Sequence, residues 1–193
     1  VFLGFADKKE TPTSSRAMSA SIDRITAYDR DGKEVNVSAL NVEDVRYNEM
    51  FPLVPYVFAQ ENGLPDASSQ TTDHMPEKGG FQPETLPLDA IEVNRNLLNI
   101  IGSRMIAYPQ ATLTITGTTD GKIEAKTKDL PERRANWAKN YLVTAFGIDP
   151  ARIVTKTSAT PSKPSAATDP DGIVENRRVE FSSNVPDVLA PVV

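Results

Sequence analysis

The sequence predicts a layered α/β (α+β) sandwich, in which a mixed β-α-β-α-β-β sheet carries its helices on one face and follows an N-terminal β-hairpin extension. From residue 51 onward, short apolar runs typical of strands alternate with two segments of helical periodicity. Such alternation favours right-handed crossovers within one sheet. With 193 residues and 39% hydrophobic content, the chain is also large enough to bury one core.

The first 48 residues are predicted to form a linker and a hairpin extension. Residues 1–19 are rich in lysine, serine and threonine, as linkers are. Short strand-like runs then flank Asp29-Arg30-Asp31-Gly32, a turn that ends on glycine. The chain starts at a valine and has no run near the roughly 18 apolar residues of a membrane span, so we expect membrane contact only through an upstream segment.

The main domain is predicted over residues 49–184, with residues 185–193 as a C-terminal tail. Residues 51–58 are apolar on both faces, which indicates a covered strand, and their two prolines favour an edge position. Residues 60–87 contain four prolines and no periodicity, which predicts a long insertion loop. The remaining strands are expected at residues 113–117, 152–156 and 178–181.

Two helices are expected from the spacing of apolar residues. Between residues 88 and 105 these residues recur close to the 3.6-residue period. The second helix is expected to start after Asp129, because Asp129, Pro131 and Glu132 together are typical of a capping box. Gly147 suits the left-handed residue that ends a helix. The expected buried stripe of this helix consists of Ala135, Ala138, Leu142 and Ala145.

Composition excludes several classes of function. A formal net charge of −5 argues against the basic face that nucleic-acid binding requires. The chain has no cysteine and a single histidine, so we expect neither a metal site nor a cofactor. It also lacks a phosphate-binding loop, a dinucleotide fingerprint and a nucleophile with an adjacent base. We therefore predict that the protein is not an enzyme and has no catalytic residues.

Asp120 and Arg134 carry the clearest functional signature. Arg134 falls in the first turn of the second helix, where the helix dipole disfavours cations, so an anionic partner would explain it. Backbone amides and a guanidinium together suit a carboxylate. Asp120 lies at the end of the preceding strand, just before the connection to this helix, so its carboxylate can lie beside the same helix terminus. A carboxylate and a guanidinium that face one gap fit a zwitterion. The alternative is a structural ion pair, which contributes only about 0–1 kcal/mol when exposed.

Three blocks of sequence, in the same order, resemble signatures of the OmpA-like (OmpA/Pal/MotB C-terminal) peptidoglycan-binding family. The resemblance spans about residues 51–183, and residues 147–153 are similar to the family's helix-to-strand link. The blocks are Ile115-Thr116-Gly117-Thr118-Thr119-Asp120, then Leu130 with Arg134-Ala135, then Asn176-Arg177-Arg178-Val179-Glu180.

The resemblance implies a non-catalytic anchor that binds peptidoglycan on the periplasmic side of the outer membrane, within the cell envelope. In that family the aspartate pairs with the ammonium of diaminopimelate in the stem peptide, and the arginine holds its carboxylate. These roles fall on Asp120 and Arg134. The resemblance also implies that Thr119, Asn176 and Arg177 line the pocket.

The chain departs from the family pattern around the same site. Thr118 replaces a histidine, Leu130-Pro131 replaces Leu-Ser, and Thr127 occupies a pocket position where an asparagine is expected. The loop between Asp120 and the helix is also one residue short. An alternative is therefore an OmpA-like structural or protein-interaction domain that has lost or altered peptidoglycan binding and uses insertion 60–87 as its contact surface.

The arginines of the third block also allow an interpretation without a function in binding. Arg177 and Arg178 fit a solvated strand edge as well as a pocket, and we favour the solvated edge for Arg178 because side chains alternate along a strand.

Overall fold

The structure, a computed structural model, describes residues 26–37, 49–66, 70, 81–87 and 89–193. The chain divides into two units, residues 1–46 and residues 47–193, and each is described by itself. The predicted linker over residues 1–19 lies outside the described residues.

The N-terminal unit contains the predicted β-hairpin. Strands β1 (Ala27–Tyr28) and β2 (Glu34–Val35) pair antiparallel, with Ala27 opposite Val35. One carboxylate oxygen of Asp29 accepts hydrogen bonds from the backbone amides of Asp31 and Lys33. Gly32 has φ +78°, a conformation that glycine adopts without steric cost. The hairpin prediction is therefore confirmed, although each strand has only two residues.

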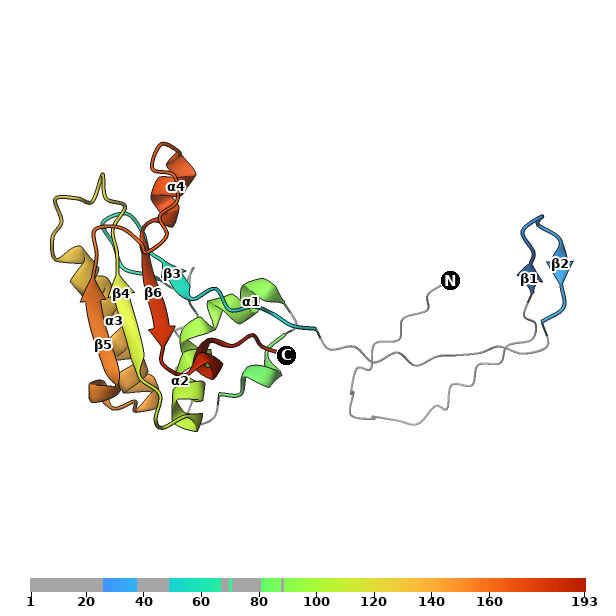
Figure 1. The fold of residues 1–193 in the computed structure, drawn as a ribbon, viewed down its shortest axis with the longest axis horizontal. Coiled ribbons are helices and arrows are strands. Elements are labelled where there is room, and N and C mark those ends of the chain that lie inside the picture. Colours follow the sequence, from blue (N-terminus) through green and yellow to red (C-terminus); the bar gives the residue numbers. More distant parts are fainter. Residues whose placement is uncertain (1–25, 38–48, 67–69, 71–80, 88) are drawn as a thin grey trace, which may run out of the picture. The chain divides into compact units, whose positions relative to one another are not determined.

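A mixed four-stranded sheet forms the second unit, in the order β3-β6-β4-β5 (Figure 1). Its strands are β3 (Tyr56–Phe58), β4 (Leu113–Gly117), β5 (Ile153–Thr157) and β6 (Arg178–Ser183). Strands β4 and β5 are parallel, whereas β6 runs antiparallel to both of its neighbours, β3 and β4. The predicted fold class is confirmed by this sheet and the helices packed on it.

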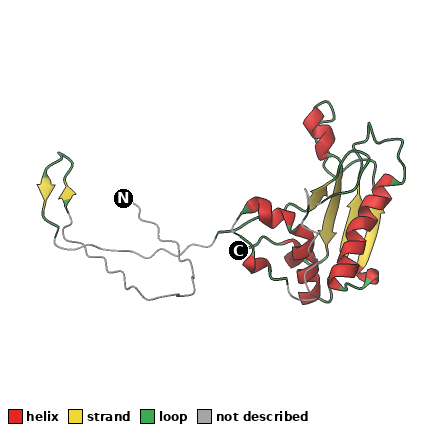
Figure 2. Ribbon diagram, turned by 180° about the vertical axis from the view of Figure 1, so that it is seen from behind, coloured by secondary structure: helices red, strands yellow, loops and turns green. Residues whose placement is uncertain are grey.

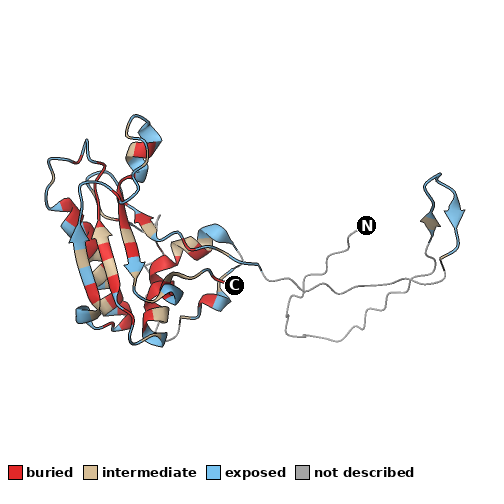
Figure 3. Cartoon of the chain, viewed as in Figure 1, coloured by how far each residue is buried: buried red, intermediate tan, exposed pale blue. Residues whose placement is uncertain are grey.

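Helices α1 (Ala90–Arg95), α2 (Leu97–Ala107) and α3 (Leu130–Phe146) lie on one face of the sheet (Figure 2). Helix α3 packs on β4 and β5, and α2 packs on α3. The buried positions gather where these layers meet (Figure 3). None of the helices in the described part of the chain combines the length and apolar character that a membrane span needs.

Helix α3 has the predicted buried stripe but not the predicted capping box. Its buried residues include Ala135, Ala138, Leu142 and Ala145, and Gly147 ends it with φ +66°. Asp129 already has helical dihedral angles, φ −85° and ψ −15°, and its side chain makes no cap hydrogen bond. An oxygen of that carboxylate lies instead 3.6 Å from a guanidinium nitrogen of Arg133 on the helix surface. The capping-box prediction is therefore wrong.

Two predicted elements are shorter or divided in the structure. The strand expected over residues 51–58 is confined to β3, because Pro52 and Pro55 have no amide hydrogen to donate, and Phe51 instead forms an isolated bridge to Val192. The helix expected over residues 88–105 is divided into α1 and α2 at Asn96.

A short helix also occurs where a loop was expected, between β5 and β6. Helix α4 (Pro170–Glu175) begins after Asp169, whose side chain accepts a hydrogen bond from the amide of Asp171. The Asp-Pro pair at its start is typical of a helix N-terminus as well as of a turn. Three 3₁₀ turns complete the described structure: η1 (Pro83–Thr85), η2 (Pro150–Arg152) and η3 (Pro186–Leu189).

The C-terminal segment packs on the domain. Val188 in η3 and Val192 near the chain end are both buried in the core. The guanidinium of Arg104 on α2 donates hydrogen bonds to the backbone carbonyls of Ala190 and Pro191. Residues 185–193, expected to form a tail, thus contribute apolar side chains to the core.

Gly117 sets the distance between the end of β4 and the start of α3. A Cβ atom at this position would lie 1.8 Å from the carbonyl oxygen of Pro131 and 3.0 Å from the amide nitrogen of Ala135. Real Cβ atoms do not approach backbone so closely, so only glycine lets the strand end and the helix start come this near.

We predict that Gly117→Ala lowers the free energy of unfolding by about 2 kcal/mol or more, because the backbone must shift to relieve the clash. Urea denaturation followed by circular dichroism measures the change. Lys156→Ala, on the exposed part of β5, is the matched control and is expected to stay within about 0.5 kcal/mol of the parent. Equal urea midpoints for the two variants would contradict the prediction.

Candidate functional site

The predicted site residues meet where β4 ends and β6 begins. Because these strands are antiparallel neighbours, with Gly117 opposite Val179, the residues that follow β4 lie beside those that precede β6. The amide of Thr118 donates to the carbonyl of Arg178 at 3.0 Å, and its hydroxyl donates to the carbonyl of Asn176 at 2.9 Å. The fold thereby joins the first and third sequence blocks.

Asp120 is a buried carboxylate with three hydrogen-bond donors around it. One oxygen accepts from the backbone amides of Lys122 at 2.8 Å and Glu124 at 3.0 Å. The other oxygen accepts from Nε of Arg177 at 3.0 Å. Burial raises the pKa of Asp120, but the two amides and the Arg177 guanidinium outweigh it and hold the pKa below its usual value.

Arg134 is fully buried, and its guanidinium is saturated by partners within the chain. Nε donates to the carbonyl of Gly63 at 2.9 Å. Nη1 donates to the carbonyl of Thr118 and to Oε2 of Glu124, both at 2.7 Å. Nη2 donates to the carbonyl of Gln60 at 2.8 Å and to Oε1 of Glu124 at 2.7 Å. A guanidinium has five N–H groups, and these five hydrogen bonds use all of them.

Glu124 is the site residue that the sequence analysis missed. Its side chain has no exposed surface and binds Arg134 through both oxygens, and Oε1 also accepts from the amide of Asn62 at 2.8 Å. Glu124 is the only acidic residue between Gly121 and Lys128. A buried arginine needs a carboxylate or an equivalent partner, so this isolated acidic residue could have been predicted as the partner of Arg134.

The gap expected between Asp120 and Arg134 is therefore filled. Among the described residues Asp120 pairs with Arg177, and Arg134 pairs with Glu124. The two pairs form one network, since Nε of Arg177 also lies 3.9 Å from Oε1 of Glu124. The half-exposed side chain of Glu61 adds a third carboxylate, 2.8 Å from Nη2 of Arg177. Three carboxylates and two guanidinium groups leave this network with a formal charge of −1.

The remaining predicted site residues lie around this network, and each makes a hydrogen bond to a neighbouring segment. The hydroxyl of Thr119 donates to the carbonyl of Ala159 at 2.7 Å. The side-chain amide of Asn176 accepts from the amide of Ser165 at 2.8 Å and donates to its carbonyl at 3.1 Å, which ties the β5–β6 connection to the site. Thr127 lies in the loop before α3, with its hydroxyl 3.5 Å from the side-chain oxygen of Asn62.

Arg178 does not form a solvated edge, so that interpretation is wrong. Strand β6 lies inside the sheet between β3 and β4, and the side chain of Arg178 is buried. Its guanidinium lies 3.0 Å from Oε1 of Glu180 and 4.6 Å from the centre of the Tyr56 ring. Arg178 thus stabilises the sheet through an ion pair and a cation–π contact.

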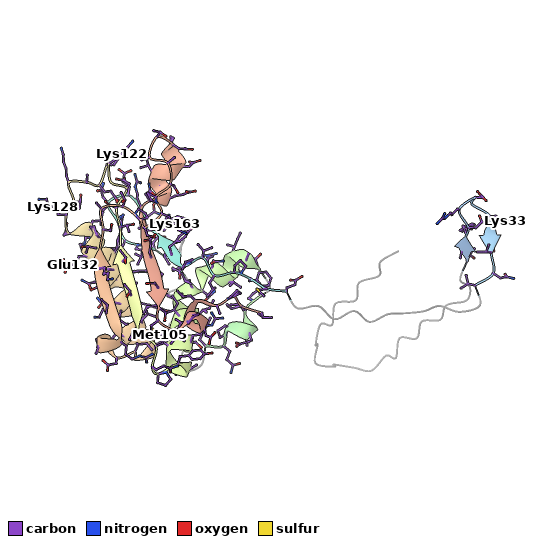
Figure 4. All side chains as sticks on the ribbon, in the orientation of Figure 1. Lys33, Met105, Lys122, Lys128, Glu132 and Lys163 are labelled. Carbon is purple, nitrogen blue, oxygen red and sulfur yellow. The ribbon has the colours of Figure 1, made fainter. Side chains whose placement is uncertain are left out.

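A cleft of about 290 Å³, lined by both polar and apolar residues, opens beside this network. Thr119, Thr127 and Glu124 line it, together with Lys128, the start of α3 and the end of β5. Figure 4 shows Lys122 and Lys128 at the end of the domain where β4 and β5 finish. Within the described residues, no group of three or more histidine, cysteine, aspartate or glutamate side chains is arranged to hold a metal ion.

No protein-family model and no curated protein matches this chain. Several solved structures are similar to it. The cell wall anchor of the T6SS from Pseudomonas aeruginosa is 20% identical over 53% of this chain and 72% of that chain, with a TM-score of 0.38. The C-terminal domain of Helicobacter pylori MotB is 20% identical over 48% of this chain and 75% of that chain, with a TM-score of 0.38.

The OmpA-like domain of FopA1 from Francisella tularensis is also similar to this chain. It is 18% identical over 53% of this chain and 68% of that chain, with a TM-score of 0.37. The MotB and OmpA-like domains bear names of the family that the sequence resembles.

We predict that Arg134→Gln lowers the free energy of unfolding by about 3–5 kcal/mol, because the substitution leaves the Glu124 carboxylate buried without its partner. Arg133→Gln is the matched control on the same helix turn. Its ion pair with Asp129 is half exposed, so it should cost no more than about 1 kcal/mol. Urea denaturation measures both values, and similar losses for the two variants would refute the structural role of the buried pair.

Asp120 is expected to make stability depend on pH in the acid range. The pKa of Asp120 is lower in the folded state than in the unfolded state. Its contribution to folding stability is therefore fully present above the unfolded-state pKa of about 3.9, and it is lost as the pH falls through the folded-state pKa. The difference in unfolding free energy between the parent and Asp120→Asn should therefore shrink on acidification. A difference that stays constant between about pH 6 and pH 3 would contradict this expectation.

Proposed function

We propose that this chain is a non-catalytic module that associates with peptidoglycan and anchors a protein of the cell envelope to the cell wall. One observation supports it above the others: Arg134 holds a carboxylate through both oxygens, at 2.7 Å each, and the residue that supplies this carboxylate is among those that line a cleft. The carboxylate belongs to Glu124, but the arrangement is that of a receptor for a carboxylate.

The finer proposal is that the ligand group is the diaminopimelate of the stem peptide. The free end of diaminopimelate carries an ammonium and a carboxylate on one carbon. Asp120 would receive the ammonium and Arg134 the carboxylate, as the family resemblance implies. Thr119 and Thr127 line the cleft, whereas Arg177 and Asn176 position Asp120 and the neighbouring loop.

We further propose a location on the periplasmic side of the outer membrane. Hydrogen bonds to charged groups contribute roughly 1.5–3 kcal/mol each, less the cost of separating the existing ion pairs. Affinity for one stem peptide is therefore expected to be weak. A wall offers many copies of the ligand, and multiple attachments raise the effective concentration.

A second candidate is an OmpA-like structural or protein-interaction domain without the diaminopimelate clamp. The saturated guanidinium of Arg134 favours it, because every N–H donor is already used within the chain. The beginning of insertion 60–87 supplies two of these acceptors, the carbonyls of Gln60 and Gly63, and the carboxylate of Glu61 binds the neighbouring Arg177.

Co-sedimentation with purified peptidoglycan sacculi tests the proposed function. The parent chain should pellet with sacculi that contain diaminopimelate, and Asp120→Asn should bind at least about tenfold more weakly, equivalent to 1.4 kcal/mol. Asp129→Asn is the matched control, since it makes the same change on an exposed side chain next to the site. Each variant is first checked for folding by circular dichroism.

Sacculi with lysine in place of diaminopimelate separate the coarse proposal from the fine one. Equal binding to both wall types would retain peptidoglycan association but refute the diaminopimelate specificity. If the parent stays in the supernatant, or if Asp120→Asn and Asp129→Asn pellet alike, the clamp is wrong and the second candidate is favoured.

A further inference from the structure

Glu124 lies where a ligand's carboxylate would have to bind. We propose that it is an internal competitor that sets the specificity of the site: a carboxylate-bearing ligand binds Arg134 only by displacing Glu124. This inference rests on the proposed function and adds a determinant of ligand choice to it. It concerns a residue of this chain's own loop, in the segment where the chain departs from the family pattern.

The contacts of Arg134 make displacement necessary. Both terminal nitrogens bind Glu124 at 2.7 Å, and the other three N–H groups are held by backbone carbonyls of residues 60, 63 and 118. Those carbonyls are main-chain atoms at the end of β4 and in residues 60–63, so they cannot leave without a movement of the backbone. The Glu124 side chain is the one partner that a ligand carboxylate can replace atom for atom.

The position of Glu124 in its loop makes displacement feasible. Residues 121–126 are exposed except for Glu124 itself, so no buried apolar side chain holds this part of the loop on the core. Its carboxylate is held by Arg134 and by the amide of Asn62. Glu124 is also among the residues that line the cleft, although its side chain has no exposed surface, so this loop borders the space from which a ligand would approach.

An internal carboxylate changes which ligands bind. Exchanging one carboxylate for another at Arg134 is nearly balanced, so a simple carboxylate gains little. Net affinity must come from a second group, such as an ammonium that Asp120 can receive, or from contacts along the cleft. Glu124 therefore disfavours ligands that carry a carboxylate but no ammonium group. Specificity arises here because the site binds such ligands less well.

Glu124→Ala in the full chain tests the proposal, with meso-diaminopimelate as the probe. This variant leaves the buried Arg134 charge without its carboxylate, so its thermal midpoint should fall. Its affinity for meso-diaminopimelate, measured by calorimetry, should nevertheless rise by about tenfold or more. A residue with a structural role alone would lower both stability and affinity.

Two further probes make the test specific to the carboxylate. Acetate has the same heavy atoms that Glu124→Ala removes, so it should raise the thermal midpoint of this variant more than chloride at equal ionic strength, and should not do so for the parent. Cadaverine, a diamine without a carboxylate, should bind the parent and the variant equally. Glu132→Ala, at an exposed position in the first turn of α3, is the control and should match the parent with every probe.

The outcomes distinguish this inference from the function on which it rests. If the parent binds sacculi but Glu124→Ala and Glu124→Gln both bind meso-diaminopimelate no better than the parent, the competitor role is overturned and the proposed function stands. Failure of acetate to stabilise Glu124→Ala would likewise overturn it, because Arg134 would then not accept a free carboxylate. If neither the parent nor any variant binds sacculi or meso-diaminopimelate, the proposed function fails and this inference fails with it.

Discussion

The burial of the Arg134 guanidinium is the constraint on which the rest of the site depends. A charge without exposed surface is tolerated only when its donors are matched, because separation from water costs several kcal/mol per ion. Five acceptors meet this requirement, and they come from the end of β4, the start of insertion 60–87 and the loop before α3. One side chain thereby holds three segments together.

The topology of the sheet makes that convergence possible. Antiparallel pairing of β4 and β6 brings Asp120 to Arg177, and the close approach at Gly117 sets the first turn of α3 against the strand end. The resulting network couples two arginines to three carboxylates. The stability of the domain consequently draws on these charges, and a ligand that engaged them would have to exchange one ion pair for another.

Local patterns predicted much of the fold, and the site only in part. The buried stripe of α3, its end at Gly147 and the alternation in β4 follow from spacing and residue type. The prediction of a capping box was wrong because Asp129 has helical dihedral angles, which residue type alone does not reveal. Helix α4 was missed because an Asp-Pro pair starts turns and helices alike.

The sequence by itself determined the order of the sheet strands and of the two main helical segments, the resemblance to the OmpA-like family, and Asp120 and Arg134 as the residues to examine. Only the tertiary structure decided their partners. Glu124 is four residues from Asp120 in the chain, whereas Arg177 is 57 residues from it, and Gln60 is 74 residues from Arg134. Pairings of buried charges depend on which segments the sheet and helices bring into contact, and local periodicity does not encode that contact.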